Sequence, residues 1–177
     1  MDVSTAIKSN RSVRKFTDQP VPRDDIERIV NAGRLSGSAK NRQPWRFVVV
    51  TARDTLQALS ECGPWCTHLA GAAFAVVMVV KDLTDPPTLT TPFDLGRASQ
   101  NMILAAWDLG IGSCMATVYE PQRARVALGV PDDRAVPWAI SFGYPHPDAD
   151  PRNRPPRKEG RRSFDEVASS ETWNENE

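Results

Sequence analysis

Apolar residues recur at two different spacings along the chain and predict alternating helices and strands. In five segments they return every three or four positions, which is typical of amphipathic helices. These segments are residues 3–9, 24–30, 54–59, 94–109 and 121–128. Three further apolar segments, residues 47–51, 74–80 and 138–144, predict strands. The first two are rich in β-branched residues and lack alternation, which predicts strands covered on both faces.

Residues at the ends of the helical segments predict where the helices begin and stop. Asp24 and Glu27 have the spacing of a capping box, and Asp54 and Asp94 are candidate N-caps. Pro121 and Gly129 match a proline in the first turn and a glycine just past the end. The apolar stripe of the 94–109 helix is wide enough for a central helix or a dimer seam, and the pattern does not choose between them.

Length and charge limit the class of protein. The 177 residues predict one domain, 1–177, with residues 145–177 as an extended tail rich in proline and arginine. Phe164, Val167 and Trp173 predict that the end of this tail docks on protein. Lys plus Arg (22) balance Asp plus Glu (22), which disfavours nucleic acid as a partner. The longest apolar run, 72–80, is too short for a bilayer, and without a secretory signal pattern we expect a cytoplasmic protein with no membrane partner.

The cysteines predict reduced thiols. Cys62, Cys66 and Cys114 are odd in number, and nothing in the sequence indicates export. Cys62, Cys66 and His68 resemble part of a metal site, but a structural zinc needs four ligands and His146 lies far along the chain. We therefore predict no metal.

Two polar segments are candidates for ligand binding. In the first, Arg11, Ser12 and Arg14 either form a clamp for a phosphate or make a solvated basic helix end. The second is the loop 35–45, which contains Gly37, Ser38, Asn41 and Gln43. This loop can read the edge of a flat heterocycle, or it is an ordinary connection between a helix and a strand.

Seven segments, taken in order, resemble the flavin-dependent nitroreductase family. They are Arg11–Phe16, Ser38–Phe47, Asp94–Gly96, Ala105–Ser113, Leu128–Pro131, Gly143–Pro145 and Arg161–Val167. The resemblance implies an α+β fold with a mixed sheet flanked by helices. It also implies an intertwined homodimer with FMN in its interface.

The same resemblance assigns roles by position. Arg11, Ser12 and Arg14 would bind the FMN phosphate, ribityl chain and pyrimidine edge. Ser38 and Asn41 would line the ring and its side chain, supported by Gln43, and the backbone of Ala116, Thr117 and Val118 would face the ring. Arg161 matches an arginine that returns to the phosphate, with Arg157 and Arg162 as competitors.

The expected function is that of a flavoprotein oxidoreductase. Because the flavin carries the chemistry, no catalytic side chain is expected. NAD(P)H would reduce FMN and leave, and a nitroaromatic or other electron-poor small molecule would then take the electrons in a ping-pong exchange. Three alternatives stay open. The first is a dehalogenase, azoline oxidase or flavin-degrading member of the family. The second is a flavin-binding dimeric module without turnover, and the third is an arginine-rich tail that binds an acidic partner or nucleic acid.

Two departures from the family pattern affect the expected site. The family commonly has proline-serine where this chain has Gly37-Ser38, which would loosen the loop. Many members also carry a helical excursion where this chain has the proline-rich residues 82–92. We therefore expect a short member with an open pocket.

Overall fold

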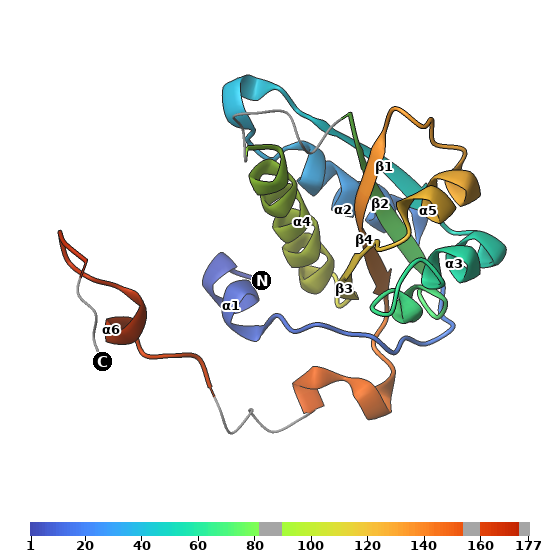
Figure 1. The fold of residues 1–177 in the computed structure, drawn as a ribbon. Helices are drawn as coiled ribbons and strands as arrows, with labels where there is room; N and C mark the ends of the chain where they lie inside the picture. Colours follow the sequence, from blue (N-terminus) through green and yellow to red (C-terminus); the bar gives the residue numbers. More distant parts are fainter. Residues whose placement is uncertain (82–89, 154–159, 174–177) are drawn as a thin grey trace.

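A four-stranded antiparallel sheet forms the centre of the molecule. The computed structural model describes residues 1–81, 90–153 and 160–173 (Figure 1). The strands are β1 (Trp45–Val50), β2 (Phe74–Val80), β3 (Gly112–Thr117) and β4 (Ala135–Gly143), in the order β1-β2-β4-β3. Every described strand pair is antiparallel, and one isolated parallel bridge joins Ser12 to Ser113. The α+β class is confirmed, with an antiparallel sheet in the described residues.

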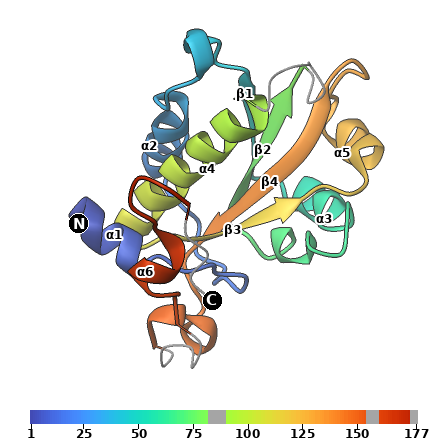
Figure 2. The same ribbon diagram turned by 60° about the vertical axis from the view of Figure 1, so that its left-hand side comes forward.

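Helices cover both faces of this sheet (Figure 2). α2 (Arg23–Arg34) and α4 (Thr90–Asp108) lie on one face, and α3 (Arg53–Ser60) and α5 (Pro121–Leu128) lie on the other. α1 (Val3–Ser9) packs near the end of α4, where Trp107 Nε1 donates to Ser9 Oγ at 2.8 Å. α6 (Phe164–Val167) belongs to the tail.

β2 connects the two halves of the core. Alternate side chains of a strand point to opposite faces. Phe74, Val76 and Met78 therefore join the core under α2 and α4, whereas Ala75 and Val77 join the core under α3 and α5. All seven residues of β2 are buried, which confirms the strand predicted to be covered on both faces.

For β1, the prediction of a strand covered on both faces is wrong. It is the outermost strand next to β2, and the helices cover it only in part, so that Arg46 and Val49 are exposed. A β-branched run without alternation therefore does not separate a central strand from an edge strand.

Three of the predicted helix caps are wrong. α2 begins after Pro22 and α3 after Ala52, without a side-chain cap in either case, and α4 begins at Thr90, four residues before Asp94. Asp24 and Asp54 lie in the first turn of their helices, where an acidic residue favours the helix dipole without bonding to a backbone N–H, so composition alone mimics a cap. Asp94 lies beyond the first turn of α4. The helix from Pro121 to Leu128 is confirmed, and Gly129 closes it at φ 62°.

β3 was not predicted as a strand. Gly112, Ser113 and Cys114 have little intrinsic strand preference, and the strand forms because β4 pairs with it along its whole length. Val13 packs against Gly112 so closely that an added Cβ there would lie 2.6 Å from its Cγ2. Val13 N–H also donates to Ser113 C=O at 2.9 Å, which fixes the N-terminal segment against β3.

The tail divides into a packed part and an exposed part. Arg152 pairs with Asp150 and lies 5.5 Å from the ring of Trp107, which holds residues 146–153 against the body. Residues 160–173 stand apart beside α1 (Figure 1), with Phe164, Val167 and Trp173 79%, 58% and 84% exposed. Within this chain the predicted docking of these three side chains does not occur.

Two other sequence predictions concern the expected open loop, residues 82–92, and membrane-spanning helices. Residues 82–89 of the expected open loop lie outside them, and residues 90–92 form the first turn of α4. None of the helices that are described is long and apolar enough to cross a membrane.

Candidate functional site

The segment from Arg11 to Arg14 lies along the beginning of β3. Val13 is buried against Trp107 and Phe16, and because the segment is extended, Ser12 and Arg14 point the opposite way. Both of these residues are exposed. Arg11 donates to the C=O groups of Lys8 and Asn10, each at 2.8 Å, at the end of α1. The helix-end interpretation therefore describes Arg11, whereas Ser12 and Arg14 are presented outward.

A neutral polar layer lies behind this segment. His68 Nδ1 and Ser141 Oγ are 2.8 Å apart, and the Ser141 hydroxyl donates to Cys114 C=O at 3.3 Å. Burial lowers the pKa of His68, and the nearby positive charge of Arg14 lowers it further. Burial also raises the pKa of the Cys114 thiol. Arg14 is therefore the charged group that faces outward here, and no hydrogen bond or ion pair of its guanidinium is found in the described part of the chain.

The loop from Ser38 to Gln43 has a strained backbone. Lys40, Asn41 and Gln43 have φ of 51°, 53° and 48°, a region that non-glycine residues rarely occupy. Gln43 N–H donates to Ser38 Oγ at 2.9 Å, and Gln43 Nε2 donates to Asn41 Oδ1 at 3.2 Å. Such strain persists only where surrounding contacts hold it, and it is concentrated at ligand-binding sites.

A buried carboxylate anchors this loop. Asp94 is only 3% exposed, and its Oδ2 accepts from Ala39 N–H at 3.0 Å, across 55 residues of sequence. Sequence analysis placed Asp94 at the start of a helix. The structure instead makes it the link between α4 and the loop.

The two candidate ligand-binding segments lie at opposite ends of α4. The loop is tied to Asp94, and the Arg11–Arg14 segment packs on Trp107. Asp94 and Trp107 are thirteen positions apart in α4, which corresponds to about 20 Å along the helix axis. One chain therefore does not bring Ser38, Asn41 and Gln43 next to Ser12 and Arg14.

The predicted backbone contacts lie on the same side as Arg14. Ala116 and Thr117 are the last residues of β3, and Val118 follows it. β3 is an edge strand, and among the described residues its outer side makes one bridge, from Ser113 to Ser12. Ala116 and Val118 are buried toward α3 and α5, and Thr117 is exposed. From Ser113 to Thr117 is about 13 Å. The structure thus brings Ser12, Arg14 and residues 116–118 onto one edge of the sheet.

Thr117 and Val118 also border a recess of about 550 Å³. Trp138 and Pro137 from β4 and Arg125 from α5 form other parts of its wall. Sequence analysis missed these three residues, because the recess arises only when α5 folds over the end of β4. No spacing along the chain indicates it.

Two cysteine thiols donate hydrogen bonds to backbone carbonyls, and that of Cys66 reaches a residue of the candidate site. The Cys66 thiol donates to Thr117 C=O at 3.3 Å, and the Cys62 thiol donates to Ala58 C=O at 3.4 Å. Burial raises the pKa of Cys66 to about 11, so its thiol stays protonated as a donor. Among the residues that the structure describes, no three His, Cys, Asp or Glu side chains are grouped to hold a metal ion.

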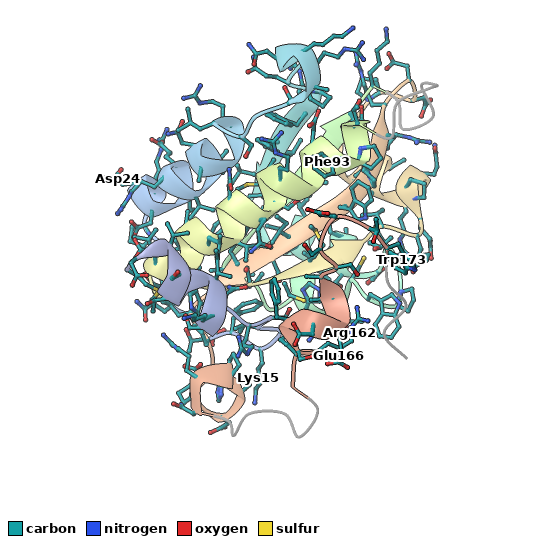
Figure 3. All side chains as sticks on the ribbon, turned by 90° about the vertical axis from the view of Figure 1, so that its left-hand side faces the viewer. Lys15, Asp24, Phe93, Arg162, Glu166 and Trp173 are labelled. Atoms are coloured by element: carbon teal, nitrogen blue, oxygen red, sulfur yellow. The ribbon has the colours of Figure 1, made fainter. Side chains whose placement is uncertain are left out.

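Among the described residues, no hydrogen bond or ion pair joins Arg161 or Arg162 to Ser12 or Arg14. Arg161 and Arg162 are exposed in the segment that precedes α6, and Figure 3 shows Arg162 close to that helix. Arg157 lies outside the described residues. The assignment of a late arginine to a phosphate stays a prediction.

Solved structures share this architecture. A protein of Parabacteroides distasonis, provisionally named NADH dehydrogenase/NAD(P)H nitroreductase, superposes with a TM-score of 0.79 at 27% identity, over 96% of this chain and 98% of that one. A nitroreductase family protein of Clostridium difficile 630 gives a TM-score of 0.82 over 98% of this chain and all of that one. At 22% identity, the second likeness concerns the fold alone.

Sequence comparison defines the family. The model of the Nitroreductase family matches residues 7–64 and 57–144. An Archaeoglobus fulgidus protein, provisionally named NADH dehydrogenase/NAD(P)H nitroreductase, is 37% identical over 81% of this chain and 86% of its own length. A Vibrio harveyi NADPH-flavin oxidoreductase is 28% identical over 84% of this chain and 67% of its own. The chain belongs to the nitroreductase family, as its sequence motifs predicted.

Proposed function

We propose that this protein is an FMN-dependent oxidoreductase that uses NAD(P)H to reduce nitroaromatic or other electron-poor small molecules by a ping-pong mechanism. The relatives named NAD(P)H nitroreductase and NADPH-flavin oxidoreductase support the general class, an NAD(P)H-dependent oxidoreductase that carries a flavin.

The edge of β3 is the observation that carries the proposal. Arg14 presents a guanidinium whose hydrogen-bonding groups are free within the described chain, and Ser12 lies beside it. Arginine matches the geometry of a phosphate, and a hydroxyl adds a neutral hydrogen bond. From there the backbone runs about 13 Å to residues 116–118, a length that suits a ribityl chain and the near edge of a flavin ring. These residues therefore fit FMN.

We further propose that a second copy of the chain completes the site. The strained loop has the donors and acceptors for a ring edge, yet it lies about 20 Å along α4 from the clamp of the same chain. In a two-fold dimer, the loop of one protomer can reach the clamp of its partner, and the reverse contact follows by symmetry. Ser38, Asn41 and Gln43 of one protomer would then line a flavin whose phosphate binds Ser12 and Arg14 of the other.

The bound flavin would supply the chemistry by taking a hydride from the nicotinamide and passing the electrons on. The protein's own part is to bind and orient. Arg14 contributes a fixed positive charge, and the backbone of residues 116–118 contributes polar groups that need no proton transfer. The recess bordered by Thr117 and Trp138 gives an electron-poor acceptor a place at the end of the strand.

A spectrum of the purified protein tests this function. We expect a yellow protein with a flavin absorbance band, and we expect NADPH or NADH added under argon to bleach that band. An added nitroaromatic should restore the colour. Yellow protein that does not bleach would indicate a flavin-binding module without turnover, and protein that stays colourless with added FMN would contradict the proposal.

A further inference from the structure

The absence of a side chain at position 37 makes room for an arginine. A Cβ built on Gly37 would lie 2.5 Å from Nη2 of Arg97, so the guanidinium occupies the space that any other residue would fill. Sequence analysis treated this glycine as a loosening of the loop. The structure shows instead that Gly37 lets Arg97 of α4 lie directly against the loop, next to Ser38.

The guanidinium of Arg97 is weakly held by the protein itself. Its Nη1 lies 3.8 Å from Asp94 Oδ1, and its central carbon lies 6.0 Å from the ring centroid of Phe93. Its side chain is 48% exposed. The ion pair and the cation–π contact are both long for their kind. The described residues show no hydrogen bond from this guanidinium. Within the described part of the chain, most of its donors therefore have no protein partner.

The surroundings of Arg97 favour an anion with a flat apolar part. Lys40 and Arg42 are exposed cations on the loop. Among the described residues, the carboxylate that lies near Arg97 is that of Asp94, which is buried and already accepts from Ala39 N–H. Phe93 is 67% exposed beside the guanidinium, and Figure 3 shows it on the outer side of the first part of α4. An exposed ring next to an exposed cation suits an aromatic or heterocyclic molecule with a negative group.

We propose that Arg97, for which Gly37 leaves space, binds a negatively charged group of a substrate that enters beside the flavin-binding loop. This inference rests on the proposed function, because the loop has to be part of the flavin site. Two substrates could carry the charge: NADPH through its additional phosphate, or an aromatic acceptor through a carboxylate. The shared chemistry is one oxyanion bound by one guanidinium.

The test compares, in the Arg97→Gln protein, pairs of molecules that differ in one negatively charged group. Without turnover, benzoate and benzamide are titrated into the oxidised holoprotein, and their dissociation constants are taken from the change in the flavin spectrum. In steady state, KM is measured for 4-nitrobenzoate against 4-nitrobenzamide, and for NADPH against NADH. We expect the KM ratio of 4-nitrobenzoate to 4-nitrobenzamide, or that of NADPH to NADH, to rise about tenfold, the size expected for losing one charge-assisted hydrogen bond.

Two further variants sharpen the result. Gly37→Ala places a methyl group where the guanidinium lies, and the same ratio should rise by a smaller factor. Arg23→Gln removes an exposed arginine of α2 whose partner is Glu27, and the ratio should keep its wild-type value. FMN content, read from the ratio of flavin to protein absorbance, checks that each variant still holds the cofactor.

The outcomes separate the two proposals. An acceptor ratio that rises identifies a carboxylate, and a nicotinamide ratio that rises identifies the phosphate. If neither ratio changes in Arg97→Gln while wild-type flavin still bleaches with NAD(P)H, the role of Arg97 is wrong and the oxidoreductase stands. A wild-type protein that takes up no FMN would overturn both.

Discussion

The two ends of α4 carry the two halves of the proposed flavin site, and they are built differently. At the Trp107 end, the Arg11–Arg14 segment is fixed by backbone hydrogen bonding to β3 and by the burial of Val13. At the Asp94 end, the loop is held by one buried carboxylate and contains three non-glycine residues at positive φ. The clamp half is held by backbone pairing with the sheet, whereas the loop half is held by side-chain hydrogen bonds, among them that of the buried Asp94.

This difference indicates which half tolerates change. Substitutions that leave the backbone of the clamp intact should alter binding with little effect on folding. Loss of the loop's anchor should release a strained segment and affect both. The predictions below exploit this contrast, from the largest expected effect to the smallest.

Asp94→Leu should have the largest effect. The substitution removes the acceptor of Ala39 N–H, and an unpaired buried donor costs about 1–3 kcal/mol. We expect the free energy of unfolding in urea to fall by about that amount. FMN content after dialysis should fall more than about tenfold, because the loop no longer holds its shape.

Asp94→Asn is the matched control, because its amide oxygen can still accept from Ala39. It should keep more than half of the wild-type FMN. Equal losses in the leucine and asparagine variants would show that charge, and not the loop's hydrogen bond, is what matters at Asp94.

Arg14→Ala should separate binding from folding. Arg14 is exposed, so we expect the free energy of unfolding to change by less than about 0.5 kcal/mol. Without its guanidinium, the dissociation constant of FMN should rise about tenfold or more in a fluorescence titration. Arg28→Ala removes an arginine of α2 that pairs with Asp25, and it should leave that constant unaltered. Unchanged FMN affinity in Arg14→Ala would contradict the proposed binding of the FMN phosphate by Arg14.

His68 should make the stability of the clamp half sensitive to acid. Burial keeps its folded-state pKa below the usual 6.5, so the unfolded chain takes up a proton first as the pH falls. The contribution of neutral His68 to the free energy of unfolding is therefore fully present above pH 6.5 and is lost as the pH falls below it. Urea unfolding at pH 7.5 and pH 5.5 should show this decline in the wild type. His68→Gln should reduce the decline, whereas His146→Gln should retain it.

The smallest effect concerns the thiols beneath β3. Cys62, Cys66 and Cys114 are buried, and the pKa of Cys66 is raised to about 11. A thiol alkylates through its thiolate. At pH 8 the native protein should therefore gain little mass from iodoacetamide in the time that urea-unfolded protein gains three adducts. Rapid labelling of the native protein would show that the core around Cys62, Cys66 and Cys114 opens readily to solvent.

The sequence predicts the parts of this fold that depend on local pattern. β2 follows from a continuous apolar run, and α5 follows from a proline at its start and a glycine past its end. β3 could not be predicted in this way, because its first residues become a strand only through pairing with β4. Local propensity does not contain that information.

In the candidate site, too, the sequence predicts some residues, whereas others depend on tertiary contacts. Ser12, Arg14, Ser38 and Asn41 were identified from motifs that resemble a family, and family membership is confirmed. Motifs could not indicate that Asp94 anchors the loop across 55 residues, or that Arg97 fills the space over Gly37. They also could not indicate that the clamp and the loop lie at opposite ends of one helix.

A complementation experiment tests most directly whether two chains build one site. Arg14→Ala disables the clamp, and Asn41→Gly disables the loop while keeping a residue that accepts positive φ. Each variant alone should hold little FMN. After equal amounts are unfolded in urea and refolded together, half of the dimers should be mixed, each with one intact site, so bound FMN should recover to about a quarter of the wild-type level. Bound FMN no higher than the average of the separate variants would contradict a site shared between two protomers.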